Sequence, residues 1–126
     1  MFLRRVFFAS FLLLVSAASH ALEIKPFTAA LLAQAQASNQ PVALHFHADW
    51  CPTCRAQEKV VQSLKSESGL DMTVLVVNYD TEKELKKRFN VRAQSTFVVL
   101  RGQQEWARLV GDTDPAAIRT AFKSAL

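Results

Sequence analysis

Short apolar segments alternate with segments of helical periodicity along most of this chain. Residues 42–48 form an apolar run that contains two histidines, and residues 72–79 form a second run rich in valine. Runs of this length without polar alternation predict strands that are buried on both faces of a sheet. Between them, apolar residues recur at helical spacing at Ala56, Val60, Val61 and Leu64. This alternation favours parallel strands that are joined by crossover helices.

The C-terminal half of the chain predicts two further strands and a closing helix. Residues 96–100 and 105–110 read as strands on either side of a tight turn, which would make them antiparallel neighbours. A last helix is expected to begin at Asp114-Pro115, and residues 22–25 offer a short edge strand. The predicted fold class is therefore α/β, with a central mixed β-sheet flanked by helices on both faces.

A short helix is also expected after the second strand. Thr81 and Glu84 have the spacing of a capping box, in which two side chains satisfy free backbone N–H groups at a helix start. Leu85 and Phe89 would then face the core. We therefore predict that Thr81 caps this helix.

The first 21 residues are predicted to be a cleaved signal peptide, outside the fold. Two arginines near the N-terminus precede an apolar run over residues 6–18, and Ser19 and Ala21 place small residues at the cleavage positions. This run is shorter than the roughly 20 residues that a membrane span requires, although an uncleaved anchor stays open. We expect a periplasmic or otherwise exported protein with one domain, residues 22–126.

The charge of the chain does not indicate a nucleic-acid partner. Without the two arginines of the predicted signal peptide, 13 of the 15 basic residues remain against 11 acidic ones, a net charge of +2. No basic stripe interleaved with aromatic residues is present. We expect a monomer that acts on proteins and needs no cofactor.

Cys51 and Cys54 stand where the predicted strand 42–48 meets the following helix. At a helix N-terminus, free N–H groups and the helix dipole favour an anion, so Cys51 would have a lowered thiol pKa. Its thiolate would attack a partner's disulfide, and Cys54 would resolve the mixed disulfide. Pro52 suits the first helical turn and stiffens it, and Thr53 adds a hydroxyl near the sulfurs.

Other interpretations of the two cysteines are possible from the residues alone. A structural disulfide would add little stability, since a spacing of three residues barely constrains the unfolded chain. A four-cysteine zinc site would need a second pair, which the chain lacks. The main alternative is a periplasmic copper or zinc module that uses both cysteines with His45 and His47. A non-catalytic peptide-binding or chaperone domain is a further alternative.

Residues 48–55, Ala-Asp-Trp-Cys-Pro-Thr-Cys-Arg, resemble the active-site segment of the thioredoxin superfamily. The likeness covers nearly all of residues 22–126. With Glu58 four residues after Cys54, the segment is most similar to the exported C-terminal domain of the DsbD membrane reductase. The resemblance implies a thioredoxin-like fold and a thiol–disulfide oxidoreductase that acts on protein thiols and disulfides. It also implies that the protein leans toward acting as a reductant and that it receives electrons from a membrane-embedded donor.

The resemblance places a substrate-binding surface around the cysteines. Its expected residues are Trp50, Pro52, Thr53, Ser95 and Thr96. The family usually has a cis-proline where this chain has Ser95. Because a cis bond without proline costs about 2.5–4 kcal/mol, we predict a trans peptide between Gln94 and Ser95. The Ser95 hydroxyl is then expected to contact a sulfur.

His45 occupies the position at which thioredoxins carry a buried aspartate. That aspartate serves the resolving cysteine as a proton acceptor, and a histidine with a pKa near about 6.5 can do the same. The competing interpretation is a neutral core histidine held by one hydrogen bond. His47 projects to the same strand face two residues later and is expected to pack.

Overall fold

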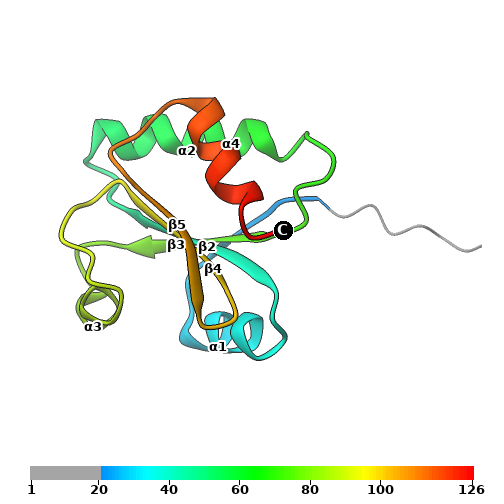
Figure 1. Cartoon of the computed structure of the whole chain (residues 1–126). Helices are drawn as coiled ribbons and strands as arrows, with labels where there is room; N and C mark the ends of the chain where they lie inside the picture. Colours follow the sequence, from blue (N-terminus) through cyan, green and yellow to red (C-terminus); the bar gives the residue numbers. More distant parts are fainter. Residues whose placement is uncertain (1–20) are drawn as a thin grey trace, which may run out of the picture.

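The computed structural model describes residues 21–126, so the predicted signal peptide lies almost entirely outside the described residues. Five strands form one sheet in the order β1-β3-β2-β4-β5 (Figure 1). The elements in chain order are β1 (Glu23–Pro26), α1 (Ala29–Ala37), β2 (Pro41–His47), α2 (Pro52–Leu64), β3 (Thr73–Asn78), α3 (Lys83–Arg88), β4 (Thr96–Arg101), β5 (Gln104–Val110) and α4 (Pro115–Lys123).

The sheet is mixed, as the sequence predicts. Strand β3 runs parallel to both β1 and β2, whereas β4 runs antiparallel to β2 and to β5. The short N-terminal edge strand is present as β1. Strand β2 lies at the centre, where His45 pairs with Val76 of β3 on one side and with Phe97 of β4 on the other. All seven residues of β2 are buried, because sheet neighbours and helices enclose the strand completely.

Helices cover both faces of the sheet, which confirms the predicted layers. In Figure 1, α2 and α4 lie above the sheet and α1 and α3 lie below it. Two apolar clusters fill these interfaces. The cluster under α2 and α4 includes Ala43, Val61, Leu64, Phe97, Val99, Ile118 and Phe122. The cluster over α1 and α3 includes Leu32, Val42, Leu44, Phe46, Leu85 and Val98. Successive residues of β2 alternate between these clusters, and this sets which side chains face the N-terminal end of α2.

The predicted capping box before α3 is wrong. The helix begins at Lys83, and its cap residue, Glu82, makes no side-chain capping hydrogen bond. The reason is a turn at the end of β3. The Asn78 carbonyl accepts from the N–H groups of Thr81 and Glu82 at 3.3 and 3.0 Å, so these residues are used in the turn. By contrast, α4 begins at Pro115 as expected, and the Asp114 side chain caps it by accepting from the N–H of Ala116.

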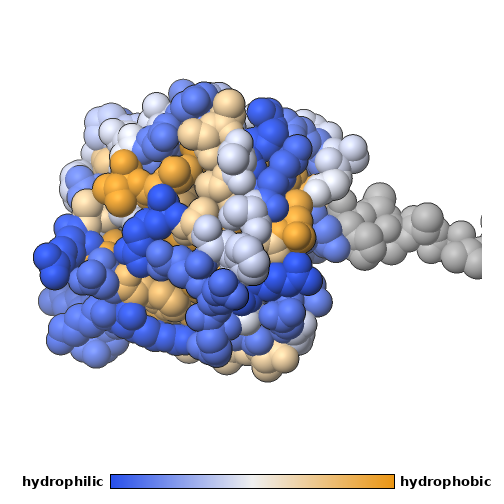
Figure 2. Space-filling model, viewed as in Figure 1, coloured by the Kyte–Doolittle hydropathy of each residue, from blue (hydrophilic) through white to orange (hydrophobic). Residues whose placement is uncertain are grey.

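The surface seen in Figure 2 is largely hydrophilic, and apolar residues form separate patches on it. The large hydrophobic side chains that stay exposed are Trp50, Trp106, Val110 and Leu126. Between residues 21 and 126, no helix is both long and apolar enough to cross a membrane.

Candidate active site

Both cysteines lie where β2 passes into α2. Cys51 is the cap residue of α2, and its Sγ accepts a hydrogen bond from the backbone N–H of Cys54 at 3.2 Å. Pro52 occupies the first helical position, where its missing N–H has no role in the helix. Both cysteines are free thiols; Cys51 is 3% exposed and Cys54 is fully buried. The helix start therefore holds one sulfur just under the surface and a second sulfur behind it.

The Ser95 hydroxyl lies between the two sulfurs. Its Oγ is 3.2 Å from Cys51 Sγ and 3.0 Å from Cys54 Sγ. This confirms the expected contact with a sulfur and extends it to both. The peptide before Ser95 is trans, as predicted, since no cis peptide occurs in residues 21–126. Ser95 has a φ of 61°, a left-handed conformation that is uncommon for a residue other than glycine.

Backbone and side-chain hydrogen bonds fix Ser95 in this conformation. Its N–H donates to the Phe46 carbonyl at 2.9 Å, and its carbonyl accepts from the Gly111 N–H at 2.8 Å. The same carbonyl accepts a second bond from Gln57 Nε2 at 3.0 Å. An uncommon backbone conformation persists where the surrounding structure holds it from several sides, and such sites concentrate near functional groups.

Gln57 is a central residue of the site that the sequence interpretation missed. It is fully buried on α2, and its Nε2 donates to the carbonyls of Ser95 and Asp112, the latter at 2.9 Å. Its Oε1 therefore faces His45 Nε2, at 2.9 Å, and accepts a hydrogen bond from the ring N–H. The buried residues of α2 are Cys54, Gln57, Val61 and Leu64. A glutamine on this otherwise apolar stripe is the signal that could have pointed to it.

His45 is buried under α2 and bonds to Gln57 through Nε2. Its ring stacks on Phe97, with the centroids 4.2 Å apart. Burial lowers the pKa of His45 from 6.5 to about 4, although the bond to Gln57 acts in the opposite direction. The ring is therefore neutral near pH 7. A role for His45 as the proton acceptor of Cys54 stays a prediction.

The two thiols have pKa values that are shifted in opposite directions. Burial raises the pKa of Cys51, but hydrogen bonds from Cys54, from Ser95 and from the backbone outweigh it, so the pKa falls below the usual range. Burial and the bond to Cys51 together raise the pKa of Cys54. Cys51 is thus the more readily ionised sulfur, which suits a nucleophile, and Cys54 holds its proton.

His47 lies on the outer side of the same strand face, between two carboxylates. Its Nδ1 is 3.5 Å from Asp49 Oδ1, and its Nε2 is 3.4 Å from Glu58 Oε2. Its Nε2 is buried and, among the described residues, has no hydrogen-bond partner. The ring meets that of His45 edge-on at 5.3 Å. His47 packs as expected but in a charged environment.

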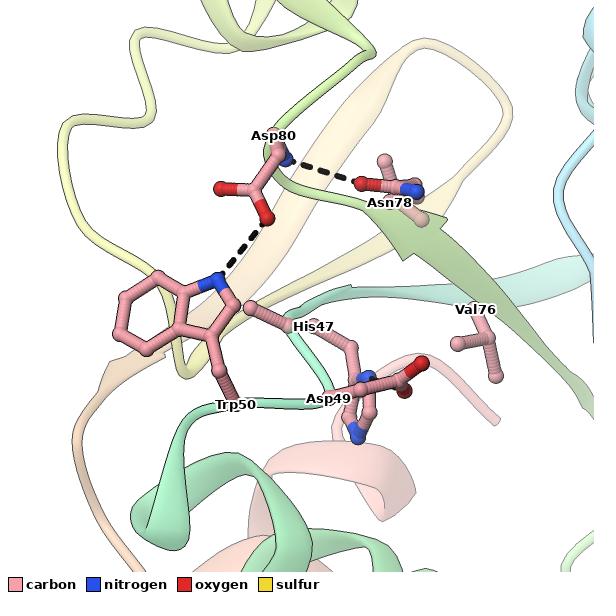
Figure 3. Close-up of a pocket in the computed structure, with 8 residues that line it drawn as sticks. His47, Asp49, Trp50, Val76, Asn78 and Asp80 are labelled. Carbon is pink, nitrogen blue, oxygen red and sulfur yellow. Dashed lines mark hydrogen bonds and ion pairs between the residues drawn. The ribbon is translucent and has the colours of Figure 1, made fainter.

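A polar groove of about 370 Å³ is lined by residues 47–50, which precede Cys51, and by residues at the end of β3 (Figure 3). Trp50 borders it and is 59% exposed. The indole Nε1–H donates to Asp80 Oδ2 at 2.9 Å, and the Asp80 N–H donates to Asn78 Oδ1 at 3.0 Å. This bond holds the exposed indole against the end of β3.

The expected substrate-binding residues fall into two layers. Trp50 and Pro52 are exposed, and Thr53 is half-buried beside Cys51. Ser95 and Thr96 are buried beneath them, and the Thr96 hydroxyl donates to the Ala93 carbonyl at 2.8 Å. The side-chain hydroxyl that reaches the sulfurs is that of Ser95, not that of Thr53. A docked polypeptide would first contact the exposed layer.

The described residues give no support to a metal carrier. No group of three or more His, Cys, Asp or Glu side chains in residues 21–126 is arranged to hold a metal ion. His45 is bonded to Gln57, and in residues 21–126 no hydrogen bond links its ring to either sulfur.

The family model of thioredoxin matches residues 20–124 of the chain. Among curated proteins, the chain is 30% identical over 95 residues to thioredoxin of Mycobacterium bovis, covering 75% of this chain and 82% of that protein. It is 32% identical over 90 residues to the bifunctional thioredoxin reductase/thioredoxin of Mycobacterium leprae. The match covers 71% of this chain but only 20% of that longer protein.

Solved structures give the same result. The chain is similar to Trxlp from Edwardsiella tarda, with a TM-score of 0.73, 38% identity, and coverage of 78% of this chain and 96% of that one. It is also similar to the germline-specific thioredoxin Deadhead of Drosophila melanogaster, with a TM-score of 0.67 and 26% identity. That match covers 82% of this chain and 98% of the fly protein.

Proposed function

The chain belongs to the thioredoxin family and is a thiol–disulfide oxidoreductase, and we propose that it works outside the cytoplasm as a reductant of protein disulfides. A membrane-embedded donor would return it to the dithiol form. The observation that carries the exchange chemistry is the pair of sulfurs with opposite pKa shifts at the start of α2, whereas the proposed direction and location rest on the resemblance of residues 48–55 and on the N-terminal sequence. One sulfur is ready to attack, and the other keeps its proton until the second step.

Reduction proceeds in two steps through this pair. The Cys51 thiolate attacks one sulfur of the partner's disulfide, and the displaced partner sulfur leaves with the bonding electrons and takes up a proton. Cys54 then gives up its proton and attacks Cys51 Sγ, which releases the second partner sulfur. The partner gains two electrons and two protons, and the Cys51–Cys54 pair becomes a disulfide.

Export and the membrane donor are supported by the N-terminal sequence and by the resemblance of residues 48–55 to the exported DsbD domain. Both cysteines then reach a compartment in which thiols are oxidised, so continued reducing activity needs a source of electrons. A donor within the membrane meets this need, because it can carry electrons from the reducing cytoplasm.

A reporter fusion tests the proposed location. The full chain is fused to an alkaline phosphatase that lacks its own signal and is active only after export, in a Gram-negative bacterial host. Phosphatase activity is expected from the full-length fusion and not from a matched fusion that begins at Leu22. Equal and low activity from the two fusions would contradict export.

Insulin tests the reaction separately. The mature protein with dithiothreitol should reduce insulin disulfides, which precipitates the insulin chains, and Cys51→Ser should not. A wild-type protein no faster than dithiothreitol alone would contradict the direction of transfer.

A further inference from the structure

We propose that the Ser95 hydroxyl is a catalytic proton relay that takes the proton from Cys54 in the resolving step, and that Gln57 is the positioning residue that holds it there. The inference concerns the exchange reaction itself. It therefore stands whether the protein acts as a reductant or as an oxidant.

The first observation is the position of one hydroxyl between two thiols. A serine hydroxyl donates one hydrogen bond and accepts others, so Ser95 Oγ can accept from one sulfur while its proton points to the other. The distances of 3.0 Å to Cys54 Sγ and 3.2 Å to Cys51 Sγ allow both bonds at once. The two sulfurs are thus joined by a path of hydrogen bonds that is one hydroxyl long.

The second observation is that no stronger base contacts Cys54. Within the part of the chain that the structure describes, no carboxylate, amine or imidazole hydrogen-bonds to either sulfur. His45 is the nearest candidate by sequence position, but its Nε2 donates to Gln57 Oε1. Burial also makes that imidazole a weak base. The deprotonation of Cys54 therefore has one side-chain route in this geometry, through Ser95.

The relay balances in atoms and electrons. In the mixed disulfide, Cys51 Sγ is bonded to a partner sulfur, and the Cys54 thiol donates to Ser95 Oγ. As the Cys54 sulfur attacks Cys51 Sγ, its proton passes to Ser95 Oγ and the original hydroxyl proton is released to solvent water. The departing partner sulfur, on the far side of Cys51 from Cys54, takes up a proton from that water. The bond between Cys51 and the partner breaks, its electron pair leaves with the partner as a thiol, and the Cys51–Cys54 disulfide forms. Ser95 ends the step as a neutral hydroxyl.

Gln57 holds the relay without contacting a sulfur. Its amide ties the Ser95 carbonyl to α2, and α2 also carries Cys54 three residues earlier. The same amide holds the Asp112 carbonyl, which secures the loop after β5 against the loop before β4. The distance between the hydroxyl and Cys54 Sγ therefore depends on one buried side chain.

Rapid mixing with oxidised glutathione tests the relay. Reduced mature protein is mixed with excess oxidised glutathione and quenched with acid. Mass spectrometry then separates the dithiol, the mixed disulfide with glutathione and the Cys51–Cys54 disulfide. The time courses give separate rates for attack and for resolution. Glutathione is an alkyl thiol, so the departing sulfur requires a proton near pH 7.

Two variants remove the hydroxyl in different backbone contexts. Ser95→Ala keeps a Cβ at a positive φ, whereas Ser95→Gly relieves the strain of that conformation. We expect both to slow resolution by about 100-fold, the usual scale of a positioned acid–base group, while attack slows by less than about tenfold. The mixed disulfide should therefore accumulate in both variants. Ser63→Ala, which removes an exposed hydroxyl on α2 that bonds to the Val60 carbonyl, is the matched control.

Three results would overturn the proposed relay. Resolution within about twofold of the wild-type rate in both Ser95 variants would exclude the relay, and so would an equal slowing of attack and resolution. A loss of resolution in His45→Phe with normal rates in the Ser95 variants would assign the proton to His45.

A double-variant cycle tests Gln57. Gln57→Met should slow resolution in the same direction as Ser95→Ala, and the double variant should be no slower than Ser95→Ala alone. Rate effects that multiply would show that Gln57 acts independently of Ser95 and would exclude its positioning role.

Discussion

Two histidines stand two residues apart on the same face of β2, and their surroundings differ completely. His45 lies in a buried interior region with Gln57, Ser95 and the sulfurs, in which hydrogen bonds link each group to the next. His47 lies at the rim, 8% exposed, between the carboxylates of Asp49 and Glu58. We call these the interior region and the rim.

The difference shows in which of the two regions the loss of a hydrogen bond costs more stability. In the interior region a lost bond leaves a buried polar group without a partner, which costs about 1–3 kcal/mol for each group. At the rim the charged partners are open to water, which screens them, so the same kind of change costs little. The interior region should therefore control stability and sulfur chemistry, and the rim should tolerate substitution.

Neighbouring residues on α2 give the largest contrast. Gln57→Leu would leave the buried Nε2 of His45 and the half-buried carbonyl of Asp112 without these partners, and the Ser95 carbonyl would keep only its bond from the Gly111 N–H. We expect a loss of about 3–5 kcal/mol in the free energy of unfolding, measured by urea denaturation. Glu58→Gln, one residue further and half-exposed, should change it by less than about 0.5 kcal/mol. Equal losses of stability in the two variants would contradict the distinction between the interior region and the rim.

The pH dependence of stability should separate the two histidines. The pKa of His45 is about 4 in the fold, against about 6.5 in the unfolded chain, so the unfolded state takes up the proton first as pH falls. The contribution of His45 to the free energy of unfolding is fully present above pH 6.5. It is lost between pH 6.5 and pH 4, by about 3 kcal/mol in total.

Urea unfolding at several pH values measures this decline. His45→Phe should flatten it, whereas His47→Phe keeps His45 and should keep that part of the slope. An unchanged slope in His45→Phe would show that His45 does not resist protonation in the fold.

The reactivity of Cys51 should depend on the interior region more than on the rim. Ser95→Ala removes one of the bonds that hold the pKa of Cys51 below its usual range, so that pKa should rise. The rate of alkylation by iodoacetamide, followed against pH in a Cys54→Ser background, should show its midpoint move upward. Asp49→Asn at the rim is the control and should leave the midpoint in place. A midpoint that moves only in the Asp49 variant would reverse the comparison.

The smallest effect is expected at the exposed indole. Asp80→Asn weakens the bond to Trp50 Nε1, which lies in the open groove of Figure 3. We expect less than about 1 kcal/mol of lost stability, with a change in Trp50 fluorescence as the indole becomes freer. Trp106→Phe removes the other indole and so assigns the fluorescence signal. A loss of stability as large as that of Gln57→Leu would show that the exposed bond between Asp80 and Trp50 matters as much as the buried hydrogen bonds.

The fold was largely predictable because its central strands are marked by apolar runs. β2 is buried throughout, and β3 is buried at Val74, Leu75 and Val77. The start of α3 was not predictable from its capping pattern, because Asn78, in the preceding strand, uses the N–H groups of Thr81 and Glu82.

The site was predictable where its chemistry is local to the chain. Cys51 and Cys54 are placed by one helix start, and the contact of Ser95 with a sulfur followed from the family position. Gln57 was missed because its partners, Ser95 and Asp112, lie 38 and 55 residues away. A local pattern contains no information about such pairs.

The reduction potential of the Cys51–Cys54 pair tests the central claim most directly. The mature protein is equilibrated with buffers of reduced and oxidised thiol, and the fraction of disulfide is measured after acid quenching. A value near about −270 mV is predicted for a reductant that a membrane donor recharges. A value near about −120 mV would identify an oxidant, and one below about −300 mV would identify a structural disulfide and contradict the account.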